Sequence, residues 1–147
     1  MQQLEQYRVA ENLEKDLGDP NHPESIMSFK TVMELDEREA CPEQELTWLY
    51  NWHLQDYYVP ANCGGKFTNF EEFLAIVRVL SRRDQTTGIA FTTLFWSFLC
   101  WMAGDEAQKQ KLSKFIIEEQ GALCLGYSER EHGSDLVNGG LTASKVP

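Results

Sequence analysis

Basic residues are scarce in this sequence. Its 147 residues include 13 lysines and arginines against 23 aspartates and glutamates, which leaves a formal net charge of -10 at pH 7. Binding of nucleic acid relies on clustered lysine and arginine, and so does a polybasic contact with a membrane surface. We therefore expect neither nucleic acid nor a charged membrane surface among the partners of this chain.

Paired cysteines and a secretory signal are also missing. The four cysteines are spread along the chain with no CxxC spacing, which fits neither a disulfide framework nor a zinc site. The first residues are polar and acidic, without the apolar segment that a secretory signal contains. We expect reduced cysteines and a cytoplasmic protein.

Only one long uncharged run is present, from Gly88 to Ala103. It is shorter than the ~20 residues that cross a bilayer, so we expect a helix buried on all sides within the protein rather than a membrane span. Its aromatic residues, Phe91 and Phe95 among them, are interpreted as core. The alternative is that they form the wall of an apolar tunnel for an acyl chain.

The dominant pattern in the sequence is helical. Apolar spacing, caps and breakers predict helices over Gln2 to Leu17, Ile26 to Glu39, from Pro42, from Thr68 or Asn69 to Asp84, Thr86 to Met102, and after Asp105. After Gly121 the pattern changes, and Ala122 to Tyr127 and Leu141 to Val146 are typical of short strands. The fold class we expect is mainly α. An antiparallel bundle of five or six helices in residues 1–120 would precede the first strands of a β-barrel domain in residues 121–147.

The segment richest in chemical groups runs from Gly126 to Asp135. Gly133 would let the backbone approach a ligand closely or take a positive φ, and the groups around Ser134 could surround an anionic or carbonyl oxygen. The alternative is a polar turn that satisfies its own backbone. A catalytic triad of Ser134, His132 and Asp135 is not expected, because triad members converge from distant segments. The histidines and cysteines lack the spacing of a metal site.

Several pieces, taken in order, resemble the acyl-CoA dehydrogenase family. The first piece is a turn in which Val59-Pro60 precedes Gly64-Gly65. A helix that ends in Leu80-Ser81-Arg82-Arg83-Asp84 comes next. The apolar helix and then the segment from Ala103 to Leu112 follow it. The last piece is Ser128-Glu129-x-x-x-Gly133-Ser134-Asp135, which matches the family's [ST]-E-x-x-x-G-S-D loop. The resemblance covers roughly Glu45 to Val146, and the final loop is its most specific part.

This resemblance implies an FAD-dependent dehydrogenase of acyl-CoA or of an acyl-carrier thioester. Ser128, Gly133 and Ser134 would contact FAD, and Tyr127, Ser134, Phe91 and Phe95 would contact the substrate. The family binds FAD between the β domain and a C-terminal helical bundle, usually in a dimer or tetramer. His132 and Tyr127 are larger than the residues usual in this loop, so a specialised acyl thioester is one alternative to a fatty acyl-CoA.

No catalytic residue follows from the resemblance, because the family's carboxylate base lies in the C-terminal bundle and no residue here matches it. We therefore expect the chain alone to be inactive, and FAD to bind only together with the remainder of the enzyme or a partner subunit. Two alternatives remain. One is a non-catalytic helical interaction module, or a split-enzyme subunit, derived from the same fold. The other is a different flavoprotein of the superfamily, such as an oxidase or a nitroalkane-type enzyme.

Overall fold

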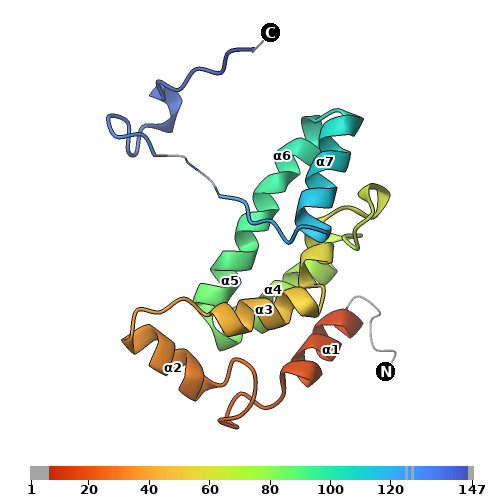
Figure 1. Cartoon of the computed structure of the whole chain (residues 1–147), viewed down its shortest axis with the longest axis vertical. Coiled ribbons are helices and arrows are strands. Elements are labelled where there is room, and N and C mark those ends of the chain that lie inside the picture. Colours follow the sequence, from red (N-terminus) through yellow and green to blue (C-terminus); the bar gives the residue numbers. More distant parts are fainter. Residues whose placement is uncertain (1–6, 125, 127, 146–147) are drawn as a thin grey trace.

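The chain is mainly helical in the computed structural model, which describes residues 7–124, 126 and 128–145 (Figure 1). Its α-helices are α1 (Arg8–Leu17), α2 (Phe29–Glu37), α3 (Glu43–Asn51), α4 (Phe70–Arg83), α5 (Gln85–Thr92), α6 (Phe98–Ala103) and α7 (Glu106–Ile117). Short 3-10 helices are η2 (Leu54–Tyr58), η3 (Ala61–Cys63), η4 (Thr93–Ser97) and η5 (Leu136–Asn138). Because α5, η4 and α6 follow one another directly, they form one helical stretch, Gln85–Ala103. The prediction of a mainly α fold is confirmed.

Side-chain caps fix where four helices begin, and Asp84 caps α5. The Asn69 carboxamide oxygen accepts a hydrogen bond from the Glu72 backbone N–H at 2.9 Å, as the sequence predicts. Asp105 and Gln108 form a reciprocal capping box with two bonds of 2.8 Å, and Ser28 caps α2. Each cap satisfies backbone donors that have no partner inside the helix. These short polar residues therefore define the start of each helix.

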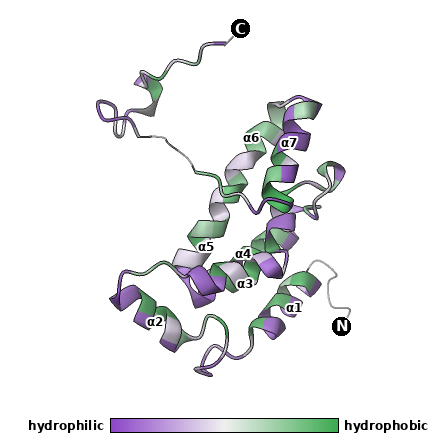
Figure 2. Ribbon diagram, viewed as in Figure 1, coloured by the Kyte–Doolittle hydropathy of each residue, from purple (hydrophilic) through white to green (hydrophobic). Residues whose placement is uncertain are grey.

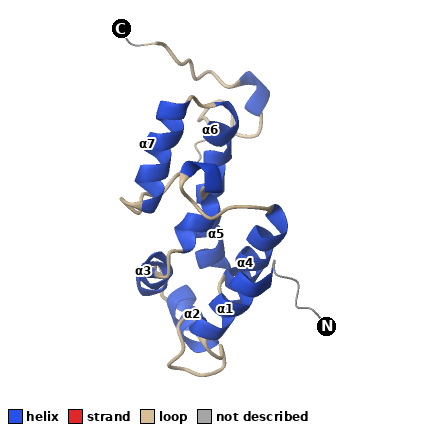
Figure 3. Cartoon of the chain, turned by 90° about the vertical axis from the view of Figure 1, so that its right-hand side faces the viewer, coloured by secondary structure: helices blue, strands red, loops and turns tan. Residues whose placement is uncertain are grey.

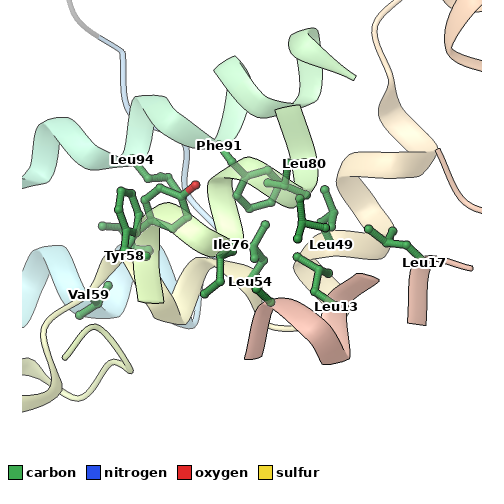
Figure 4. Packing of buried hydrophobic residues seen from close by; sticks show 14 of the residues in the cluster. Leu13, Leu17, Leu49, Leu54, Tyr58, Val59, Ile76, Leu80, Phe91 and Leu94 are labelled. Carbon is green, nitrogen blue, oxygen red and sulfur yellow. The ribbon is translucent and has the colours of Figure 1, made fainter. Parts of the chain in front are cut away.

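The hydrophobic core lies where α1, α3, α4 and α5 converge (Figure 4). Leu13, Leu49 and Leu80 are completely buried there, and Phe91 is 1% exposed. Complete burial of one such side chain contributes about 1.5–3 kcal/mol relative to leaving it in water. The core therefore depends on apolar residues that lie up to about 80 positions apart and that only the tertiary fold brings together.

A buried arginine joins α1 to the end of α4. Arg83 is 4% exposed, and its Nη2 lies 2.7 Å from Glu14 Oε1 and 2.6 Å from the Gly18 carbonyl oxygen. The neighbouring Arg82 reaches the other oxygen of Glu14 at 2.6 Å. A buried guanidinium needs an anionic partner to offset its lost hydration. The Glu14 carboxylate provides that partner.

The apolar stretch Gln85–Ala103 is not buried on all sides, contrary to the sequence prediction. Only 28% of its most apolar window is buried, and Ile89, Leu99 and Met102 are 56%, 56% and 79% exposed. Figure 2 shows the predominantly hydrophobic colouring of this stretch. Its α5 segment packs chiefly on α4, and a neighbour on one side covers only one face of a helix. By length and composition this stretch, with a mean hydropathy of 1.3, is a candidate membrane span.

The described residues contain no strand (Figure 3). The strands expected over residues 122–127 and 141–146 are therefore wrong for the described part, while Leu125, Tyr127 and Val146 lie outside it. In their place the chain is irregular apart from η5, with Val137 and Leu141 95% and 89% exposed. A strand needs a neighbouring strand to pair its backbone N–H and C=O groups. The described residues offer none.

Candidate functional site

An apolar pocket opens between α4 and the stretch formed by η4 and α6. It has a volume of about 210 Å³ and is hereafter called the aromatic pocket. Its lining comes from five parts of the chain and consists of Tyr58, Pro60, Phe67, Phe70, Phe73, Phe95, Ser97, Phe98, Trp101 and Met102. Seven of these ten side chains are aromatic. The pocket therefore offers ring faces and ring edges rather than charges.

The rings around the aromatic pocket contact one another as a continuous cluster. Phe67 and Phe70 meet edge to face with their centroids 5.2 Å apart, and Phe73 and Phe95 stack at 5.8 Å. Phe95 also stacks on Phe98 at 5.3 Å. Such pairs contribute about 0.5–1.5 kcal/mol each beyond area burial. The mutual contacts therefore hold the lining in a defined arrangement.

The pocket has a buried floor and an exposed rim. Phe73 and Tyr58 are 6% and 4% exposed, whereas Phe70 and Met102 are 56% and 79% exposed. Burial raises the pKa of the Tyr58 hydroxyl above its ordinary value, and the Thr92 side chain opposes this rise. Figure 4 shows that hydroxyl directed toward the side where Phe91 of α5 and Leu94 of η4 lie. Tyr58 is therefore neutral, and it contributes its ring to the pocket.

One hydrogen bond joins two of the polar groups in the lining. The indole N–H of Trp101 donates to Ser97 Oγ at 2.7 Å, one helical turn away. Ser97 is 3% exposed. This bond fixes the plane of the Trp101 ring as one wall of the pocket. A ligand group inside the pocket would meet almost no polar atom.

A compact turn after η2 places Phe67 at the pocket. The Phe67 backbone N–H donates to the Val59 carbonyl oxygen at 2.9 Å, and the Ala61 N–H donates to the Phe67 carbonyl oxygen at 3.1 Å. Gly65 lies so close to Val59 that a Cβ at position 65 would be 2.0 Å from the Val59 carbonyl oxygen. The turn therefore requires glycine at position 65.

Replacing Gly65 with alanine is expected to lower the free energy of unfolding by about 1–3 kcal/mol, the usual cost of forcing an extra carbon into a packed site. Chemical denaturation followed by circular dichroism measures this loss. The matched control is Gly126→Ala, because no atom lies within 4 Å of the corresponding Cβ. Equal stabilities of the two variants would contradict the close approach at Gly65.

The polar segment predicted as a cofactor loop is closed by Glu129. Its two carboxylate oxygens accept hydrogen bonds from the backbone N–H groups of Gly140 and Leu141, at 2.6 and 2.8 Å. Within the described part of the chain, the exposed hydroxyls of Ser128 and Ser134 have no hydrogen-bond partner. The carboxylate therefore shapes the loop and leaves both hydroxyls free to bind.

The structure does not bring the two groups of predicted site residues together. Phe95 lines the aromatic pocket, but Phe91 is 1% exposed and packs in the core against Tyr50 and Tyr58. The loop that carries Ser128, Gly133 and Ser134 stands clear of the helices in Figure 1. Tyr127 lies outside the described residues.

Sequence reasoning missed most of the pocket. Phe67, Phe70 and Phe73 recur every three residues, a spacing that places aromatic rings side by side where a turn enters a helix. That regular spacing was the available signal. The role of Glu129 had no signal, since its partners are backbone groups eleven and twelve residues away.

No group of three or more histidine, cysteine, aspartate or glutamate side chains suited to a metal ion occurs in the part of the chain that the structure describes. Of the described residues predicted to bind a ligand, Phe95 lies in the aromatic pocket, and Ser128, Gly133 and Ser134 lie in the loop closed by Glu129. Comparisons of the chain with protein-family models, with curated proteins and with solved structures found no match.

Proposed function

We propose that this chain is the N-terminal portion of an FAD-dependent acyl-thioester dehydrogenase. In this proposal the helices supply part of the acyl pocket, and the loop of Ser128, Gly133 and Ser134 supplies part of the flavin site. The substrate is an acyl-CoA or an acyl-carrier thioester in the cytoplasm. The catalytic base and most contacts to FAD come from the remainder of the enzyme or from a partner subunit.

The observation that carries the proposal is the state of the loop from Ser128 to Asp135. Glu129, the acid that the dehydrogenase motif requires, accepts hydrogen bonds from two backbone N–H groups that follow η5, those of Gly140 and Leu141. The neighbouring Ser128 and Ser134 are exposed. Because the Glu129 carboxylate holds the loop in place, the hydroxyls of Ser128 and Ser134 remain available. They are suited to hydrogen-bond the oxygens of a diphosphate or the edge of a flavin ring.

Glycine at position 133 supports the same conclusion. Its φ is not in the left-handed region, and a Cβ built there would have no atom within 4 Å. The described fold therefore has no need of glycine at this position. Close approach of a ligand to the backbone would explain the glycine at position 133.

The aromatic pocket suits the acyl group of the proposed substrate. An acyl group needs an apolar site, and Phe95, which the resemblance assigns to the substrate, lines this one. Bound FAD would supply the acceptor for hydride from the acyl chain. The residues of this chain would bind the acyl group, exclude water from it and orient the flavin. The proposal requires the rest of the enzyme to bring the loop beside the pocket.

The product of the intact gene tests this function. We expect it to purify with bound flavin, and we expect an acyl-CoA to bleach the flavin absorbance in the absence of oxygen. Ser134→Ala should weaken flavin binding about three- to tenfold, the effect of losing one hydrogen bond. The matched control is Ser144→Ala, an exposed serine nine residues or more from the loop motif. A colourless product that takes up no added FAD would overturn the proposal.

A second candidate function is a non-catalytic interaction module of the same origin. The exposed apolar side chains of Ile89, Leu99 and Met102 favour it, because exposed apolar faces often mark contacts between proteins. The same flavin measurement separates the two candidates. A module would form a stable complex with a partner protein and would never contain flavin.

A further inference from the structure

The aromatic pocket has the size and lining of a site for one ring. Its volume of about 210 Å³ is somewhat larger than the roughly 150 Å³ of an apolar cavity that takes up benzene. An extended alkyl chain would outgrow such a space and continue into solvent. A single ring with a short linker would fill it.

The orientation of the lining rings favours the same ligand. Phe73 and Tyr58 on the floor meet at 86°, with centroids 5.0 Å apart, and Phe95 and Phe98 present nearly parallel rings. A guest ring can therefore make both edge-to-face and stacked contacts, the two geometries that aromatic rings prefer. One such contact corresponds to about two- to tenfold in affinity beyond what the buried area provides.

The pocket has few polar atoms, and its rim is exposed and flexible. Ser97 Oγ accepts the Trp101 N–H, and the Tyr58 hydroxyl at the floor is directed toward α5. The lining therefore presents mainly apolar atoms to a guest, which favours an unsubstituted ring at the buried end. Met102 stands 79% exposed at the rim, and its flexible thioether can adapt to a linker that leaves the pocket.

We propose that the aromatic pocket binds an aryl group and, resting on the proposed function, that the thioester substrate carries this ring at the end of a short acyl chain. The aryl group would lie against Phe95 and Trp101, with its linker passing Phe70 and Met102 out of the pocket. A long straight acyl chain would be the poorer substrate.

Binding of two simple probes to the 147-residue chain tests the pocket. Ethylbenzene and 1-octanol have the same number of carbon atoms and similar hydrophobicity, but only the first has a ring. The indole N–H signal of Trp101 in a nitrogen–proton NMR spectrum, assigned with Trp101→Phe, reports occupancy. We expect ethylbenzene to saturate the shift at a concentration at least about fivefold lower than 1-octanol, as ring contacts predict.

Matched variants show where the probe binds. Phe70→Ala removes a half-exposed ring from the rim and should weaken ethylbenzene binding about two- to tenfold. Phe29→Ala removes a similarly exposed ring on α2, outside the pocket, and should leave binding unchanged. Phe95→Ala, checked for folding by circular dichroism, tests whether the Phe95 ring in the pocket wall contacts the bound probe. Equal binding of both probes, or equal effects of Phe70→Ala and Phe29→Ala, would overturn the aryl pocket.

The intact gene product tests the substrate. We expect 3-phenylpropanoyl-CoA to reduce the bound flavin at least about tenfold more efficiently than nonanoyl-CoA, which has an acyl group of equal carbon number. Faster reduction by nonanoyl-CoA would overturn the aryl substrate and leave the dehydrogenase standing. A product without flavin whose pocket still prefers ethylbenzene would overturn the dehydrogenase and its substrate but support the pocket.

Discussion

Replacing Phe91 with alanine is expected to lower the free energy of unfolding by about 3–5 kcal/mol, the cost of removing a buried phenylalanine and leaving a cavity. Phe91 is 1% exposed and packs between Tyr50, at a centroid distance of 4.9 Å, and Tyr58, at 6.2 Å. Its loss would remove these ring contacts as well as the buried area. Urea denaturation monitored by circular dichroism and by tryptophan fluorescence measures the change.

The control for this prediction is Leu99→Ala on α6. Leu99 is 56% exposed, and truncation of an exposed side chain should change the stability by less than about 0.5 kcal/mol. Similar losses in the two variants would contradict the assignment of Phe91 to the core. The comparison also separates the two roles that the sequence left open for Phe91, since a residue of an open tunnel wall would cost far less to truncate.

Replacing Glu14 with alanine is expected to destabilise the protein by about 3–5 kcal/mol, because it leaves the buried Arg83 guanidinium without its anionic partner. The Arg83 side chain is 1% exposed, and its Nε and Nη1 atoms have no hydrogen-bond partner in the structure. The carbonyl oxygens of Gly18 and of residue 14 itself, at 2.6 and 3.3 Å, would remain to accept from Nη2. The melting temperature and the denaturation midpoint both report the loss.

Two further variants show that the effect comes from the buried charge. Lys30→Ala breaks an exposed pair with Glu34 at 3.8 Å and should cost less than about 1 kcal/mol. Combining Glu14→Ala with Arg83→Met removes both charges, and we expect it to recover part of the lost stability. If Glu14→Ala alone falls within about 1 kcal/mol of the natural protein, the buried pair does not have the role described here.

The apolar stretch shows where sequence reasoning reached its limit. An uncharged run with five aromatic residues is compatible with a buried helix, a membrane span or an exposed docking face. The mean hydropathy of the run is the same in all three cases and therefore does not distinguish them. The structure buries Phe91 and Leu94 but exposes Leu99 and Met102. Which of these residues are buried depends on which side of the helix packs against α4. No local sequence pattern specifies that side.

The polar loop shows the complementary case. Its residue types predicted a binding segment, and Ser128 and Ser134 are indeed exposed. The strand pattern on either side was misleading, because alternating apolar residues form strands only beside a partner backbone. Glu129 instead reaches the N–H groups of Gly140 and Leu141. A contact across more than ten residues lies beyond any short-range pattern.

The sequence by itself determined the helical class and placed two helix starts, one at Thr68 or Asn69 and one at Asp105, because caps and apolar spacing act within a single turn of the chain. Only the tertiary structure decided that Phe91 belongs to the core, that Arg83 pairs with Glu14, and that rings from η2, α4, η4 and α6 enclose one pocket. These outcomes depend on how elements distant in sequence pack together. Packing follows the shapes of all the contacting surfaces at once.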